Sequence, residues 1–270
     1  MKNRYKLLLF LIVLIFSWGC RNNEIDTSTY CDPKFESLIS YMNLPRPVDS
    51  YNYPVLPCMN KWKEFTSSEQ MKQATSIPVD ELRKMSTQAV IQALWEYPFF
   101  VNPLAMFDGA RDIQKDFEST MRINTYQELL LRQDAAKCLY QRYVLLDPVC
   151  EGHLFHPFAF KLLMCQSVFL SQLKPDERKE LVNLAFKNDS IFTQKGHDFG
   201  TYGNQVLLMF IGRVMLNAKY IPFVNEVSKD SVLEEFVNTA VVYVQAQDEY
   251  DQKIKLVTDY AKQFILTKSE

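Results

Sequence analysis

Two short segments of this 270-residue chain hold all three of its histidines and could supply ligands to a metal ion. The first segment, residues 150–157, contains His153 and His156, and the second contains His197 and Asp198. Each segment directly precedes an apolar stretch, so parallel packing of the two expected helices would bring both segments to one end of the fold. Imidazole nitrogens and carboxylates are typical zinc ligands. The alternative is that these histidines cap helices or face solvent, because no motif of fixed spacing joins them.

The second segment, residues 195–204, also contains Gly196, Gly200 and Gly203. Glycines before a helix let a ligand approach the backbone, and the free N–H groups of a helix start favour an anion. This spacing matches neither the nucleotide P-loop nor the dinucleotide-binding fingerprint. We therefore expect a turn that starts a helix, with an anion or ligand site as the alternative.

The densest aromatic cluster contains Trp95, Tyr97, Phe99 and Phe100. One interpretation is a helix end that folds back on the core. The other is an exposed patch that binds a protein or a glycan, since aromatic faces bind both well.

Catalytic signatures such as G-x-S-x-G and H-E-x-x-H do not occur in the sequence, so no catalytic residue is assigned. Glu128 and Arg132 are four residues apart, which is the spacing of an ordinary helical ion pair. Asp134, Glu96 and Arg142 could join a network between helices instead. Catalysis by paired carboxylates is an alternative, but any acidic helical protein offers such pairs.

The cysteines follow no C-x-x-C spacing, which excludes the common zinc knuckle and redox motifs. Cys31 and Cys58 lie in a stretch expected to be irregular, and export would permit them to form a disulfide. Cys138 and Cys165 lie within apolar helical patterns, where a free buried thiol is expected. Cys150 lies in a predicted turn and could pair with either of these two.

The first twenty residues have the order of a secretion signal. A short basic start precedes ten apolar residues, 7–16, which would span about 15 Å as a helix, half of a bilayer core. The Gly19-Cys20 pair that follows resembles the cleavage site of Gram-negative lipoproteins, in which the cysteine is lipidated and becomes the N-terminus. We therefore predict that residues 1–19 are removed and that Cys20 carries a lipid. The alternatives are an ordinary cleaved signal and a retained anchor.

Composition limits the fold and the partners. Of the 30 basic residues, Lys2, Arg4 and Lys6 would leave with the signal, so 27 would remain against 32 acidic residues. A net charge of about −5 without a basic run gives no reason to expect nucleic-acid binding. The hydrophobic content of 47% supports a real core, and only seven glycines favour helices over a turn-rich β-architecture.

Apolar spacing predicts an all-α fold of about eight helices, an irregular or repeat-like array of helical hairpins around two buried helices. Residues 20–75 are expected to be a tether and an irregular Pro- and Tyr-rich segment with one short helix, followed by a single domain over residues 76–270. Thr125–Glu128 and Ser231–Glu234 have the pattern of capping boxes. The expected helices cover residues 78–97, 108–121, 125–146, 157–173, 175–187, 204–218, 231–246 and the part of the chain after 251.

Two stretches, Ser86–Pro98 and Glu128–Ala135, are similar to a group of helical secreted lipoproteins of Bacteroidetes type. The likeness covers about residues 80–147 and carries no catalytic residues. Arg21 after the cysteine, rather than Asp, resembles the pattern of lipoproteins sent to the outer membrane.

These observations together lead us to expect a lipid-anchored binding or scaffold protein of the cell envelope, without a cofactor, whose partners are the membrane and an envelope protein or glycan. A mechanical tether between envelope components is a variant of this expectation. The alternative is an envelope enzyme, or a metal- or ligand-binding protein, that uses residues 150–157 and 195–204.

Overall fold

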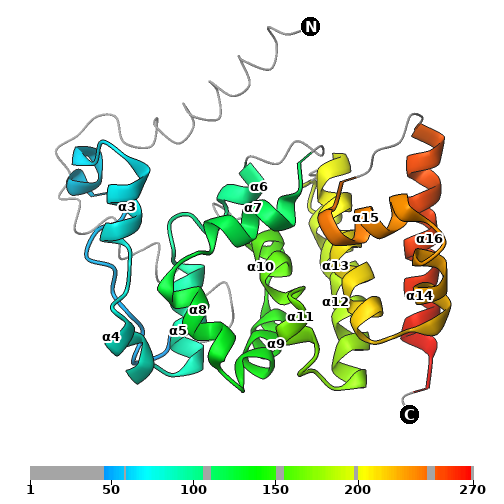
Figure 1. Ribbon diagram of the computed structural model, residues 1–270, viewed down its shortest axis with the longest axis horizontal. Helices are drawn as coiled ribbons and strands as arrows, with labels where there is room; N and C mark the ends of the chain where they lie inside the picture. Colours follow the sequence, from blue (N-terminus) through cyan, green and yellow to red (C-terminus); the bar gives the residue numbers. More distant parts are fainter. Residues whose placement is uncertain are drawn as a thin grey trace, which may run out of the picture.

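The computed structural model of the chain is helical throughout the part that it describes, which is residues 46–57, 59–105, 111–149, 155–197, 200–241 and 247–268. Within these ranges the chain forms helices joined by turns and contains no β-strand. The expected all-α class is therefore confirmed, and Figure 1 shows the helices side by side in an elongated array.

Several elements are shorter than the sequence pattern predicts, whereas α12 and α13 are longer. In chain order they are η1 (Asn60–Glu64), α3 (Ser68–Ala74), α4 (Val79–Lys84), α5 (Thr87–Trp95), α6 (Asn102–Ala105), α7 (Ile113–Thr120), α8 (Asn124–Leu131), α9 (Ala135–Leu145), α10 (His156–Met164), α11 (Ser167–Leu170), α12 (Pro175–Gln194), α13 (Gly200–Asn217), α14 (Ile221–Val227), α15 (Ser231–Thr239) and α16 (Gln247–Leu266).

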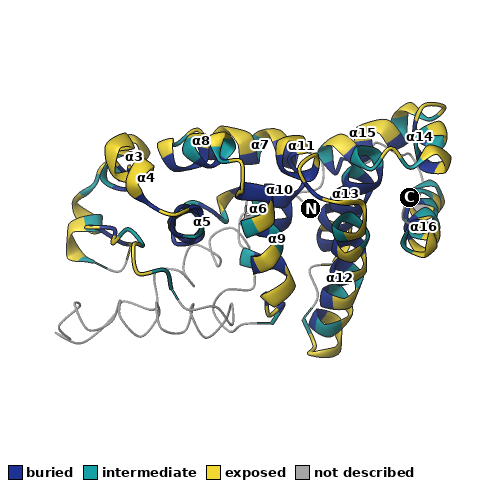
Figure 2. Ribbon diagram, turned by 90° about the horizontal axis from the view of Figure 1, so that it is seen from below, coloured by how far each residue is buried: buried dark blue, intermediate teal, exposed yellow. Residues whose placement is uncertain are grey.

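The helices lie in two rows, with α10 and α13 between them. Figure 2 shows α8, α7, α11, α15 and α14 along one side and α5, α9, α12 and α16 along the other. Helix α13 packs against α10, α11, α12, α14, α15 and α16, and α10 also packs against α6 and α9. One cluster of buried apolar side chains extends from Tyr53 to Phe264. The array around two buried helices is thus as expected, since both α10 and α13 are apolar on most faces.

The apolar stretch predicted as one helix over residues 157–173 is broken into α10 and α11. Gln166 at the break has extended backbone (ψ 132°). Its side-chain Nε2 donates to the Leu162 carbonyl oxygen at 2.8 Å, and the Cys165 thiol donates to the same oxygen at 3.2 Å. Side-chain donors thus satisfy a carbonyl at the end of α10, which lets the helix stop inside an apolar sequence.

Arg132 breaks the helix predicted over residues 125–146 into α8 and α9. Its backbone is extended (ψ 123°). Its Nη1 and Nη2 donate to the carbonyl oxygens of Met85 and Leu82 at 2.9 and 2.8 Å. Because these carbonyls end α4, the arginine serves as a C-terminal cap for a neighbouring helix.

Both predicted capping boxes are wrong. Helix α8 begins before Thr125 without a side-chain cap, and Glu128 Oε1 instead accepts from Arg132 Nε at 2.7 Å. Asp230 takes the place expected for Ser231 at α15, where its Oδ1 accepts from two backbone amides at 3.1 and 3.0 Å. Aspartate caps a helix as well as serine does, so the predicted cap of α15 lies one residue too late in the sequence.

Ser86 divides the stretch over residues 78–97 into α4 and α5, a break that the sequence allows. Its Oγ accepts from the Ala89 amide at 3.2 Å and donates to Asp49 Oδ1 at 3.0 Å. The hydrogen bonds from Ser86, chiefly from its backbone amide, hold the pKa of the Asp49 carboxyl below its usual range despite partial burial.

The other predicted helices exist with shifted ends. Helix α12 runs on to Gln194, and α15 stops at Thr239 because Ala240 adopts the left-handed conformation (φ 62°). Helices η1 and α3 lie in the stretch that was expected to be irregular. Among the described residues no single helix is long and apolar enough to cross a membrane, although the bent pair α13 and α14 passes that test when joined across a 116° bend.

Candidate functional site

The aromatic cluster at the end of α5 belongs to the core. Trp95, Tyr97 and Phe100 are 1–2% exposed, and Phe99 is partly buried. The Trp95 ring lies 5.7 Å from the Phe160 ring, centroid to centroid. The interpretation as an exposed partner-binding patch is therefore wrong for these side chains, and the helix end folds back on the core.

The described histidines each pack against an aromatic ring in a tilted arrangement. His156 begins α10 and lies 4.9 Å from the Trp95 ring, and His197 follows α12 and lies 5.1 Å from the Phe192 ring. Contact between Phe158 and Phe192 at 5.6 Å brings the start of α10 beside the end of α12. No group of three or more His, Cys, Asp or Glu side chains suited to a metal occurs among the described residues.

Among the residues named from the sequence, Cys20, Arg21, Cys31, Cys58, Cys150, His153 and Asp198 lie outside the described residues. Gly196 and Gly200 have positive φ of 80° and 57°, and α13 begins at Gly200, which confirms the expected turn at a helix start. Cys138 and Cys165 are free thiols, as predicted. Cys165 is buried as expected, whereas Cys138 is only partly buried.

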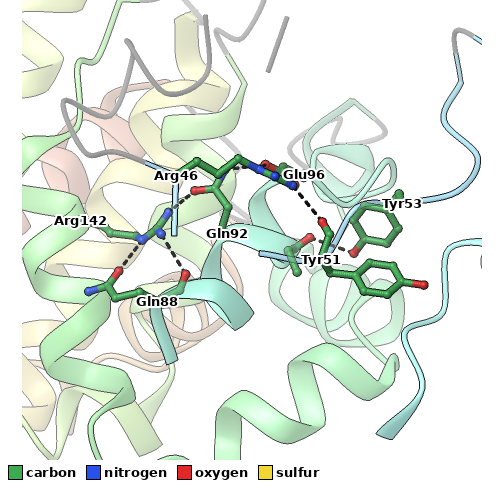
Figure 3. Close-up of polar contacts among 8 residues, drawn as sticks. Arg46, Tyr51, Tyr53, Gln88, Gln92, Glu96 and Arg142 are labelled. Carbon is green, nitrogen blue, oxygen red and sulfur yellow. Dashed lines mark hydrogen bonds and ion pairs between the residues drawn. The ribbon is translucent and has the colours of Figure 1, made fainter. Parts of the chain in front are cut away.

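A buried arginine on α9 is the centre of a polar network that Figure 3 shows. Arg142 is 1% exposed. Its Nε donates to Gln88 Oε1 at 2.7 Å, its Nη2 to the Gln88 carbonyl oxygen at 2.8 Å and its Nη1 to Gln92 Oε1 at 2.7 Å. Burial lowers the pKa of Arg142 to about 10, partly offset by Glu96, so the side chain stays charged at neutral pH.

The network continues along α5 to the N-terminal segment over residues 46–57, which we call the strap. Gln92 Nε2 donates to Glu96 Oε1 at 2.7 Å. Arg46 donates to Glu96 Oε1 and Oε2 at 2.9 and 3.2 Å, a two-point contact with a carboxylate whose side chain is 1% exposed. A further bond joins Arg46 Nη2 to the Tyr51 carbonyl oxygen at 2.9 Å (Figure 3). Arg46 and Glu96 together are called the clamp below.

The strap is also held by its tyrosines, as expected for side chains that cover the domain. Tyr53 is buried, and its hydroxyl donates to the Ala93 carbonyl oxygen of α5 at 2.9 Å. Tyr51 packs edge-on against Tyr53 at 5.3 Å. The strap therefore lies on α5 through both a charged and an aromatic contact.

A polar pocket that the sequence did not reveal lies among α7, α11, α13 and α15. Its volume is about 460 Å³, within the usual range for small-ligand sites. The lining residues are Glu118, Cys165, Gln166, Ser167, Leu170, Arg213, Leu216, Asn217 and Asn238. Arg213 within the apolar run over residues 205–216 is the sequence signal for this site, because a buried helix rarely carries a charge without a partner.

One wall of the pocket is a chain of hydrogen bonds. Arg213 Nη1 lies 3.5 Å from Cys165 Sγ, which lies 3.4 Å from Gln114 Oε1. Gln114 Nε2 then donates to Glu118 Oε1 at 2.9 Å. Burial raises the pKa of the Cys165 thiol, although Arg213 acts against this. The thiol is therefore protonated at neutral pH and is a poor nucleophile.

Lys161 on α10 is a second buried charge. Its side chain is 3% exposed, and its Nζ lies 4.1 Å from the centroid of the Phe158 ring. Burial lowers the pKa of Lys161 to about 8, opposed by the carboxylate of Asp189. The cation–π contact replaces only part of the lost hydration.

Comparisons with known proteins assign no family to this arrangement. No family model matches the chain, and neither a curated protein nor a solved structure matches it. The function is therefore argued from the geometry of the chain itself.

Proposed function

We propose that this chain is an exported protein, held in the cell envelope by a lipid on Cys20, that binds and positions a partner there. The observation that carries the proposal is the clamp. Arg46 lies in the strap, between the predicted lipid site and the helical array, and it is bound at two points to the buried Glu96 of α5. In a chain anchored by an N-terminal lipid, any load on the fold passes through the segment that precedes the helices, and the clamp fixes this segment to α5.

The clamp has the bonding expected of a contact that carries a mechanical load between the strap and α5. Two-point contacts between arginine and a carboxylate are among the stronger hydrogen-bonded pairs. Removing one partner of a buried pair strands the other charge and typically costs about 3–5 kcal/mol. The Gln92 and Arg142 contacts continue the network from Glu96 into α9, so a load on the strap is shared by two helices.

The sequence supports the proposed location of the protein and the class of its partner. The Gly19-Cys20 pair and Arg21 favour a lipoprotein of the outer membrane, and the acidic, mostly helical chain suits a protein or glycan partner better than a nucleic acid. The neutral thiol in the pocket supports binding over nucleophilic catalysis.

In-cell crosslinking of the tagged full-length protein, with mass-spectrometric readout, tests the binding role. We expect one dominant envelope partner for the wild type and its loss for Cys20→Ser, which lacks the lipid-accepting thiol. Cys138→Ser is the matched control and should keep the partner. Absence of any discrete partner for the wild type would contradict the proposal, as would an unchanged partner for Cys20→Ser.

A further inference from the structure

The pocket among α7, α11, α13 and α15 contains a guanidinium without a carboxylate. Arg213 is partly buried on α13, and its Nη1 donates to the neutral Cys165 thiol at 3.5 Å. No ion pair joins Arg213 to an acidic side chain in the described part of the chain. A partly buried arginine in a concave site presents a planar set of donors suited to a carboxylate.

A carboxylate faces the same pocket from α7. Glu118 accepts one hydrogen bond, from Gln114, and forms no ion pair with a described cation. Cys165 and Gln114 connect Arg213 to Glu118 along this wall, and the two opposite charges line one cavity without forming an ion pair with each other. Arg213 and Glu118 together therefore suit a ligand that carries both a negative and a positive charge.

An unpaired acceptor lies beside these charges. Asn217 is one of the lining residues, and its Oδ1 atom is shielded from solvent without a hydrogen-bond donor. A buried acceptor without a donor is costly, and a ligand N–H group would satisfy it. Leu170 and Leu216 add an apolar surface to the lining.

We propose that this pocket binds a small zwitterion of the amino-acid or short-peptide class. Arg213 receives the ligand carboxylate, and Glu118 with Asn217 Oδ1 receives its ammonium group. The leucines contact an aliphatic side chain. An inorganic anion suits the site less well, because Glu118 would repel it. This inference goes beyond the proposed function and does not depend on the lipid anchor.

Isothermal titration calorimetry on the purified full-length protein separates the two charges of the ligand. The probes are the dipeptide Ala-Leu, its N-acetyl derivative without an ammonium group, and its C-terminal amide without a carboxylate. We expect Ala-Leu to bind and each blocked form to bind roughly ten- to a hundredfold more weakly, the loss that follows from one charged hydrogen-bonded contact.

Two variants assign each charge to a residue. Arg213→Gln should weaken Ala-Leu binding and remove the preference for Ala-Leu over its amide, and Glu118→Gln should remove the preference over the N-acetyl form. Arg83→Gln and Glu81→Gln, exposed on α4 at the far end of the array (Figure 1), are the matched controls and should bind as the wild type does.

Thermal melts of each variant check that it folds. Because Glu118 is exposed, Glu118→Gln still tests the proposal if Arg213→Gln does not fold. The proposal is overturned if the wild type does not bind Ala-Leu or binds all three probes equally. It is also overturned if Glu118→Gln leaves the preference for the free ammonium group unchanged.

Discussion

Arg142 and Lys161 are both long cations inside the core, yet their surroundings differ. Arg142 has acceptors for its Nε, Nη1 and Nη2 groups, all from α5. Lys161 has an aromatic ring below its ammonium group and a carboxylate, Asp189, that acts on its pKa. Burial lowers the pKa of both side chains by a similar amount, so the difference between them comes from the hydrogen bonds that Arg142 makes to α5. The two residues should therefore respond to substitution in opposite ways.

Replacement of Arg142 by methionine should destabilise the fold. The substitution leaves the side-chain oxygens of Gln88 and Gln92 without their donor in a buried place. We expect a loss of about 2–4 kcal/mol in the free energy of unfolding. Urea denaturation measures it, and Arg83→Met on the surface, which should change stability by less than about 0.5 kcal/mol, is the control.

Replacement of Lys161 by methionine should stabilise the fold at neutral pH. The folded-state pKa of about 8 lies below the usual lysine value of 10.5, so as the pH rises the folded protein releases this proton before the unfolded chain does. The penalty is complete below pH 8 and fades as the pH rises toward the unfolded value, so wild-type stability should rise relative to Lys161→Met over this interval. Urea titrations at pH 7 and pH 10 measure the difference, and a constant difference would contradict the assignment.

Tertiary contacts decide where the helices of this fold end. Hydrophobic spacing continues across Arg132 and across Cys165–Gln166, so the pattern predicts one helix where the structure has two. The breaks depend on bonds to α4 and on side-chain bonds to Leu162, which periodicity does not encode. Helix existence could be predicted from sequence because burial imposes spacing locally, whereas helix ends could not.

Close packing between α13 and α15 depends on Gly212. A Cβ atom at this position would lie 2.7 Å from Val237 Cγ1, so either the Val237 side chain or one of the two helices must shift. Gly212→Ala should therefore lower the free energy of unfolding by about 1–3 kcal/mol.

A double variant tests the cause. In Gly212→Ala with Val237→Ala the added methyl group has room, so the combined loss should be smaller than the sum of the two single losses. Additive losses, measured by urea denaturation of all three variants, would show that contact with Val237 is not the reason.

Across the whole molecule, the sequence predicts the class of fold better than the site. Apolar spacing, low glycine content and the tyrosines of the strap lead to an all-α array with its N-terminal segment laid on the core. The pocket is lined by residues from four separate parts of the chain, among them Glu118, Cys165, Arg213 and Asn238, so no local motif predicts it. The aromatic cluster left a core position and an exposed patch both open, because spacing does not distinguish a buried ring from an exposed one, and the structure supports the core position.

The clamp should hold the strap to the array as a whole. Arg46→Ala leaves Glu96 without its two-point partner, so amide hydrogen exchange in residues 46–57 should become faster while α13 is unchanged. Arg83→Ala is the control and should leave the strap as in the wild type. Equal amide exchange of the strap in Arg46→Ala and Arg83→Ala would show that the tyrosine contacts alone hold the strap and that the clamp carries no load.

Mass spectrometry of the N-terminal peptide from the membrane-bound protein tests the central claim most directly. The account predicts that the chain begins at Cys20, that this residue carries acyl groups, and that Cys20→Ser leaves the membrane fraction. A chain from the same membranes that begins at another residue, or an unmodified Cys20, would contradict the claim that a lipid on this cysteine holds the protein in the envelope.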